Sequence, residues 1–487
     1  MADTGRRVRV GGSTLVWLSL ALLIAAIGVA RVSSMVMDDD NIWLAYAAIP
    51  PSSEAKALEQ ALLAHVASIQ ECFSSAYRLA LRERYTGNYA GYLAVTNVVY
   101  SAVRALGSDG ILGLVSAFAA AKLVVYGAFI GLILWAAARI RDAELNSAVA
   151  LGLAALAAAD ILAHSGLIPI FWIVELTSPL EALPKIAYSF VIFSEAHSLF
   201  GLTPRNAALA LFAAAMVFRW RGMPISASVA ILLTGIMHQT YGGISLFLFS
   251  VLTAVAKPDM LDRRPAQLVL ILSAIIYALR ERYFVAGLGL QLLLVAALVL
   301  MAAIAFAMVK SDGYRSLRRK LLGRAADQEI IVDAALSVAI CTCVTLIALA
   351  AAKNADPVTA FYFWADLVMR IWSFARFPVF VAGALLLIRL FSRTSVPPQP
   401  FIAAMAVLLT VGALTQITSN PVGRGAKDIA NAIAGERSNP GLRFPADEAA
   451  VYAHLTLVSI GHESLDEVRR QFAQPVICSA QVNPGKS

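Results

Sequence analysis

Long apolar runs, rich in Leu, Ala and Val, separate short polar stretches along most of the chain. Apolar residues in these runs do not alternate with polar ones, so the pattern is typical of helices rather than half-buried strands. Several runs approach the roughly 20 residues that a helix needs to cross a bilayer. The pattern predicts an all-α polytopic transmembrane helix bundle with about eleven spans. The expected spans lie near residues 13–35, 109–138, 145–163, 203–218, 223–238, 241–256, 266–280, 287–309, 331–352, 373–392 and 401–418.

Composition supports the same class of protein. Hydrophobic residues make up 59% of the 487 residues and charged residues only 14%, and the mean hydropathy is +0.73. A soluble domain carries roughly a quarter charged residues. The first apolar run, from Leu15 to Ala30, resembles a secretory signal, but Arg31-Val-Ser-Ser follows it rather than a small-residue cleavage site. We therefore interpret this run as a retained first helix.

The net charge of +8 is explained by where the basic residues lie. They gather on alternate short loops, as the positive-inside rule predicts for cytoplasmic loops, and no basic soluble domain that would suit nucleic acid is indicated. We expect a bacterial inner-membrane protein with a cytoplasmic N-terminus and a periplasmic C-terminus. The basic residues of the expected inner loops are Arg139, Arg141, Arg219, Arg221, Lys257, Arg263, Arg264, Lys310, Arg315, Arg318, Arg319, Lys320, Arg324, Arg389 and Arg393.

Four parts follow from this topology. They are an N-tail with the first span (1–35), a first periplasmic loop (36–108), the helix bundle (109–418) and a periplasmic tail (419–487). The first loop contains segment 53–84, whose apolar residues recur at helical spacing, so we expect an amphipathic helix along the membrane surface.

The four cysteines divide into two pairs. Cys72 and Cys478 both fall on the expected periplasmic face, where an oxidising environment favours a disulfide between the first loop and the tail. Cys341 and Cys343 lie in an apolar run, where we expect small buried hydrophobic side chains.

An acidic cluster directly follows the first span. Asp38, Asp39 and Asp40 are adjacent, and neighbouring like charges raise one another's pKa values and favour a nearby cation. Such a cluster suits a general base or a metal ligand. A solvated acidic cap that ends the helix would have the same sequence.

Further polar residues are expected at the outer ends of later spans. Pro204 suits a helix start, and Arg205 then lies in a first turn where the helix dipole disfavours a cation, which suggests either a phosphate ligand or a side chain that snorkels to the interface. His238, in Gly235-Ile-Met-His-Gln-Thr-Tyr-Gly-Gly, is expected at membrane depth, where it is either a functional group or a satisfied buried histidine. The two glycines and Tyr241 after it would permit a tight turn. The other candidates for substrate or phosphate binding are Glu195, His197, Arg280, Arg282, Asp366, Arg370 and Arg376.

In layout, about residues 1–300 resemble the C-type (GT-C) membrane glycosyltransferases. The resemblance rests on Asp38-Asp39-Asp40 after the first span, the long first outer loop, Thr203-Pro-Arg205 and His238. It implies a sugar donor on a polyprenyl phosphate and a glycan, lipid or protein acceptor. One of the three aspartates would be the general base, and Asp39 and Asp40 could instead hold a divalent metal such as Mg or Mn. Facing the donor phosphate would be Arg205, His238, Arg280 and Arg282.

Two other functions share many of these features. A polymerase or ligase of surface polysaccharide also has many spans and outer-face arginines, but it usually concentrates function in one large mid-chain loop. A secondary transporter would place charged groups near the membrane midplane and show two similar halves. Lys122, Asp160 and Asp333 fall within or near spans, where we expect paired or snorkelling side chains rather than a proton relay.

Overall fold

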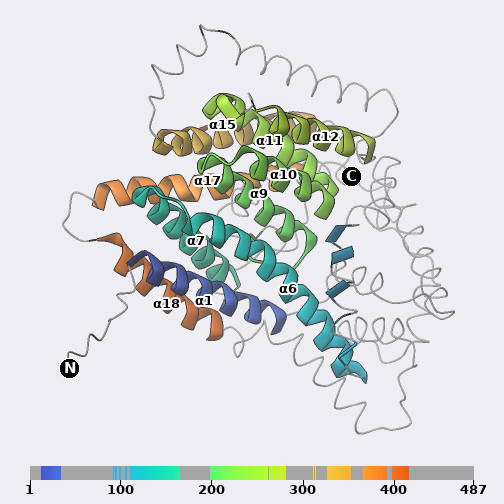
Figure 1. Ribbon diagram of the computed structural model, residues 1–487, viewed down its shortest axis with the longest axis vertical. Coiled ribbons are helices and arrows are strands. Elements are labelled where there is room, and N and C mark those ends of the chain that lie inside the picture. Colours follow the sequence, from blue (N-terminus) through green and yellow to red (C-terminus); the bar gives the residue numbers. More distant parts are fainter. Residues whose placement is uncertain are drawn as a thin grey trace, which may run out of the picture.

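The computed structural model describes residues 12–33, 110–164, 198–260, 263–280, 326–352, 366–391 and 397–415, with scattered positions between 91 and 106 and at 311 and 313. Apart from one short 3-10 turn, η2 (Pro258–Met260), the elements in these ranges are α-helices (Figure 1). They are α1 (Gly12–Ser33), α6 (Gly110–Ala138), α7 (Ala143–His164), α9 (Pro204–Trp220), α10 (Pro224–Met237), α11 (Gln239–Ala256), α12 (Arg264–Arg280), α15 (Ala326–Ala352), α17 (Asp366–Phe391) and α18 (Pro398–Thr415).

These ten helices confirm the helical prediction at ten of the eleven expected positions. The remaining expected span, 287–309, lies outside the described residues. Seven of the described helices, namely α1, α6, α7, α11, α15, α17 and α18, are long and apolar enough to cross a membrane. The chain is therefore a multi-pass helical membrane protein.

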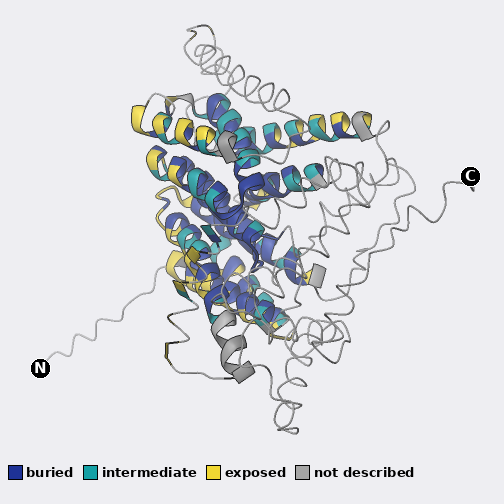
Figure 2. Ribbon diagram, turned by 90° about the vertical axis from the view of Figure 1, so that its right-hand side faces the viewer, coloured by how far each residue is buried: buried dark blue, intermediate teal, exposed yellow. Residues whose placement is uncertain are grey.

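The helices pack as a bundle around α9. This helix contacts α6, α10, α11, α15 and α17, and every one of its residues except Arg205 is buried. A helix that is apolar on all sides belongs inside a protein. On one side, α1 packs against α18, α6 and α7, and α17 lies between α7 and α15 (Figure 1). Buried residues fill the middle of the bundle, and exposed residues follow its outer helices (Figure 2).

Ion pairs show which helix ends lie together. Arg389, at the end of α17, pairs with Glu144 at the start of α7 (3.6 Å), and Lys257, after α11, pairs with Glu329 at the start of α15 (3.1 Å). These ends form what we call the basic end, because it carries most of the predicted inner-loop arginines. The C-terminal ends of α1 and α7 and the start of α9 form the opposite end.

Sequence signals fix both ends of α9. Pro204 occupies the first turn, as predicted from the sequence, and Thr203 and Asn206 form a capping box. At the other end Gly222 has φ +73°, its N–H bonds to Arg219 O, and the Met223 N–H bonds to Phe218 O. This is a Schellman motif, which ends a helix at a residue that glycine adopts without strain.

Two local predictions need correction. The glycines after His238 do not form a turn, because His238 alone separates α10 from α11, and both glycines, Gly242 and Gly243, lie inside α11. Cys341 is buried as predicted, whereas Cys343 is exposed, because the two cysteines lie on different faces of α15, a helix with an open outer side. Cys72 and Cys478, and with them the predicted disulfide, lie outside the described residues.

Candidate functional site

A chain of buried polar groups joins three elements at the opposite end. Arg31 of α1 forms an ion pair with Asp160 of α7, and Asp160 also accepts a hydrogen bond from the Ser198 hydroxyl. The amide of Asn206 in α9 donates to the Ser198 carbonyl (2.6 Å), and its oxygen accepts from the Thr203 N–H (2.9 Å). Buried ions are stable only when paired and hydrogen bonded. These bonded polar groups therefore fix the position of the segment that leads into Arg205.

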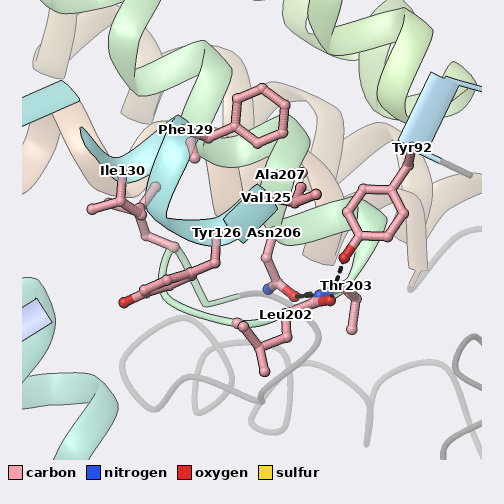
Figure 3. A pocket seen from close by; sticks show the side chains of 12 residues that line it. Tyr92, Val125, Tyr126, Phe129, Ile130, Leu202, Thr203, Asn206 and Ala207 are labelled. Carbon is pink, nitrogen blue, oxygen red and sulfur yellow. Dashed lines mark hydrogen bonds between the residues drawn. The ribbon is translucent and has the colours of Figure 1, made fainter. Parts of the chain in front are cut away.

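The same segment borders a small cavity beside α6. The Tyr92 hydroxyl donates to the Leu202 carbonyl (2.6 Å), with Thr203 and Asn206 beside it, and Ile130 of α6 lies on the other side of the cavity (Figure 3). Tyr126 also lines this cavity and donates to the Ile24 carbonyl (3.0 Å). The cavity volume is about 10 Å³, which is the space of one water molecule. We assign it a structural role, because its polar side chains, Tyr92 and Asn206, bond to the backbone of the segment before α9.

A second group of polar and aromatic side chains surrounds Tyr241, which is completely buried near the start of α11. The His238 ring lies against the Tyr241 ring, with centroids 4.6 Å apart, and the guanidinium of Arg370 lies 5.6 Å from the Tyr241 centroid. Phe374 packs on the same ring at 5.3 Å. We call these four residues the Tyr241 cluster. It brings the junction of α10 and α11 together with α17.

His238 has a defined structural role within this cluster. Its Nδ1 accepts the Tyr241 N–H at 3.5 Å and so caps the first turn of α11. In a neutral imidazole with Nδ1 as acceptor, Nε2 carries the proton and is a donor. His238 is almost completely buried. Its side chain therefore presents a donor inside the bundle rather than at its surface.

Arg376 and Arg205 lie on the neighbouring seam between α9 and α17. Buried Arg376 lines a cavity of about 10 Å³ together with Ser373, Leu209 and Phe212. Arg205 precedes Leu209 by one turn, so it shares the α9 face that borders this cavity. The Phe212 ring contacts Phe374 of the Tyr241 cluster, with centroids 4.9 Å apart. The seam and the cluster are therefore contiguous.

This arrangement suits an anion. Arg370 and Arg376 of α17 lie beside buried aromatic rings, and Arg205 of α9 lies one turn from the cavity that Arg376 lines. Inside a protein a charged interaction is stronger than in solvent. Arginine presents a planar fork of donors that matches two phosphate oxygens at once. Among the described residues no group of three or more His, Cys, Asp or Glu side chains has the arrangement of a metal site. The described side chains of this site are therefore mainly cations and hydrogen-bond donors.

The structure describes only some of the predicted site residues. Of the candidates, Arg205, His238, Arg370 and Arg376 are described, and they lie around the Tyr241 cluster and the adjoining seam. Arg280 ends α12 and Asp366 begins α17. The candidates outside the described residues are Asp38, Asp39, Asp40, Glu195, His197 and Arg282.

Sequence reasoning missed the residues that connect the site. Tyr241 was noted only as part of a turn, although a tyrosine three residues after a membrane-depth histidine lies on the same helical face. Ser198 was not singled out, because its partner Asp160 is distant in sequence, and the bond from Asn206 to the Ser198 carbonyl was missed because that acceptor lies in the backbone. Asp160 and Asp333 were expected to be paired or snorkelling side chains, and both are paired: Asp160 with Arg31, and Asp333 with Arg219.

The pair of Asp333 and Arg219 lies at the basic end and is distinct from the candidate site. Asp333 also accepts a hydrogen bond from the Trp220 indole (2.8 Å), so α15 is fixed to the end of α9. The candidate site is thus a cationic, aromatic cluster at the end of the bundle opposite to the basic loops.

No protein-family model matches this chain, and no curated protein or solved structure matches it either.

Proposed function

We propose that the chain is a membrane glycosyltransferase that moves a sugar from a polyprenyl-phosphate donor to an acceptor on the periplasmic face. It spans the bacterial inner membrane about eleven times, with its basic end in the cytoplasm. The Tyr241 cluster and the adjoining arginines hold the phosphate of the donor. The acceptor is a glycan, a lipid or a protein.

One observation carries the proposal. Hydrogen-bond donors from separate helices meet at one aromatic core, at the end of the bundle opposite to the basic loops. Arg370 and His238 lie against the same Tyr241 ring, and Arg376 lines the adjoining cavity. Arg205 lies on α9 one turn before Leu209, which borders that cavity. Membrane-embedded arginines are costly and usually serve a substrate path or an ion pair. These side chains would donate hydrogen bonds to the oxygens of a lipid phosphate at this depth, and the polyprenyl chain of the lipid would remain in the bilayer.

The proposed reaction is a single displacement at the anomeric carbon. One of Asp38, Asp39 and Asp40 accepts the proton of the acceptor hydroxyl, and the acceptor oxygen forms the new glycosidic bond as the bond to the lipid phosphate breaks. Arginines stabilise the charge on the departing phosphate. Direct displacement inverts the configuration at that carbon. Asp39 and Asp40, the predicted holders of a divalent metal, lie outside the described residues.

The test uses the purified full-length chain in detergent with a panel of polyprenyl-phosphate sugars, and it measures release of the lipid phosphate. We expect one of Asp38→Asn, Asp39→Asn and Asp40→Asn to abolish turnover. Arg370→Gln should lower turnover about a hundredfold, the effect typical of removing one donor to a developing charge. Arg389→Gln is the matched control, because it removes the same charge from the basic end of the same helix.

Two results would contradict the proposal. If no sugar of the panel is turned over or bound, the chain acts as a transporter instead. If Arg370→Gln and Arg389→Gln have equal turnover, the Tyr241 cluster does not bind the donor phosphate.

A further inference from the structure

A second cationic group lies at the basic end, far from the Tyr241 cluster. The guanidinium of Arg139 lies 4.3 Å from the centre of the Trp135 ring, and that of Arg221 lies 5.8 Å from the same centre. Trp135 belongs to α6, and Arg221 follows α9. Two arginines that follow the ends of different helices therefore lie near one tryptophan.

Local structure fixes this arrangement. The Asn146 amide donates to the Ala137 carbonyl (3.1 Å) and accepts from the Trp17 indole (3.1 Å), so α6 is held where it ends, directly before Arg139. The Schellman motif at Gly222 holds the position of Arg221. The Trp135 ring also packs edge-on against Phe218 of α9, at 6.2 Å. The site is thus built from two anchored helix ends.

The positive charge here lacks a counterion within the described residues. Neither Arg139 nor Arg221 forms an ion pair there, and Nη1 of Arg221 is buried without a hydrogen-bond partner. Of the two carboxylates that follow Arg141 in sequence, Glu144 pairs with Arg389, and Asp142 accepts the Leu145 N–H at the start of α7. An unpaired cluster of arginines is unfavourable unless an anion joins it.

Electrostatics agree with this geometry. The pKa of Arg221 is lowered by partial burial first, and then by the positive charges of Arg139 and Arg141. The Arg139 and Arg141 guanidinium groups therefore repel that of Arg221. An anion between them would remove that repulsion and supply the missing acceptor for Arg221.

The surroundings indicate what carries the anion. Trp135 is 45% exposed, and α6 continues with exposed apolar residues such as Val124, so this face of the helix meets lipid. Tryptophan is enriched at the height of the lipid headgroups. Basic pockets between transmembrane helices on the cytoplasmic side recognise anionic headgroups.

We infer that Trp135, Arg139 and Arg221, with Arg141 nearby, form a binding site for the headgroup of an anionic phospholipid. The phosphate lies between the guanidinium groups, and the acyl chains follow the exposed face of α6. This site is independent of the proposed glycosyltransferase activity. It would hold α6 to the end of α9 from the lipid side.

Native mass spectrometry of the full-length chain released from nanodiscs that contain equal amounts of phosphatidylglycerol and phosphatidylcholine tests this site. The parent should retain phosphatidylglycerol preferentially. The double substitution Arg139→Gln with Arg221→Gln should weaken retention about 30-fold, since each arginine near an anionic membrane surface contributes about a fivefold factor. The matched control, Arg263→Gln with Arg264→Gln, removes two exposed charges at the same end and should retain the lipid as the parent does.

If the double substitution prevents folding, the single substitution Arg139→Gln tests the site instead, because Arg139 is exposed and lies outside the helix. It should weaken retention about fivefold. Equal retention by the parent and the Arg139 and Arg221 variants overturns the inference. Displacement of the lipid by millimolar inorganic phosphate, or equal retention of phosphatidylcholine, also overturns it, because the site would then bind a free anion or no particular headgroup.

Discussion

Asp333 offers the sharpest test of how the bundle is held together. It pairs with Arg219, and both side chains are completely buried. Asp333 also accepts from the Trp220 indole (2.8 Å), whereas the other described partner of Arg219 is the Thr253 hydroxyl at 3.4 Å. Asp333→Ala would leave a buried guanidinium with one weak acceptor and a buried indole N–H with none.

The size of the effect follows from these contacts. Two interhelical hydrogen bonds in a membrane contribute about 1 kcal/mol together, which sets the lower bound. Leaving a buried charge unpaired costs about 3–5 kcal/mol in proteins generally. We expect Asp333→Ala to lower the free energy of unfolding by about 3 kcal/mol. Replacing both Arg219 and Asp333 by Leu should recover most of this loss, since no buried charge remains.

The assay is reversible unfolding of the purified chain in mixed detergent with increasing dodecyl sulfate. Glu329→Ala is the matched control, because Glu329 lies one turn away on the same helix and its pair with Lys257 is partly exposed. That pair should contribute less than about 1 kcal/mol. The reasoning is wrong if Asp333→Ala destabilises no more than Glu329→Ala, or if the double leucine variant is less stable than Asp333→Ala.

Three smaller predictions concern the framework, each measured in the same unfolding assay. Gly222→Ala should cost about 1 kcal/mol, because φ is +73° at a position that ends α9. Gly131→Ala, inside α6 with open space around it, should not destabilise the chain. Tyr92→Phe should cost about 1 kcal/mol by removing the hydrogen bond to the Leu202 carbonyl. Gly152→Leu should destabilise strongly, because an added Cβ already lies 3.1 Å from the Val381 Cα and α7 would be pushed from α17.

The helices were predictable because each is long, apolar and bounded by polar residues, and those features are local. The start of α17 shows the limit: the sequence predicts a span from 373, yet the helix begins at Asp366. Arg370 and its neighbours were expected in a loop because they are polar and aromatic. Arg370 is instead accommodated in the helix by the Tyr241 ring of α11, a partner that the local pattern does not contain.

The candidate site was predictable only as a set of unusual residues. Arg205 and His238 stand out because each is polar at the expected end of a span, and both belong to the described site region. Their mutual arrangement depends on contacts between distant segments: Tyr241 meets Phe374, and Arg31 meets Asp160 across 129 residues. Such pairings follow from how helices pack, which a single sequence does not specify.

The role proposed for the Tyr241 cluster requires it to lie on the opposite side of the membrane from Arg139 and Arg264. The most direct measurement is labelling of intact cells with a membrane-impermeant maleimide, using single cysteines in a chain whose own four cysteines are replaced by serine. We predict that Thr415→Cys, at the opposite end, is labelled in intact cells. Ala143→Cys, at the basic end, should be labelled only after permeabilisation. Labelling of both positions from the same side, or the reverse order, would contradict the proposed orientation.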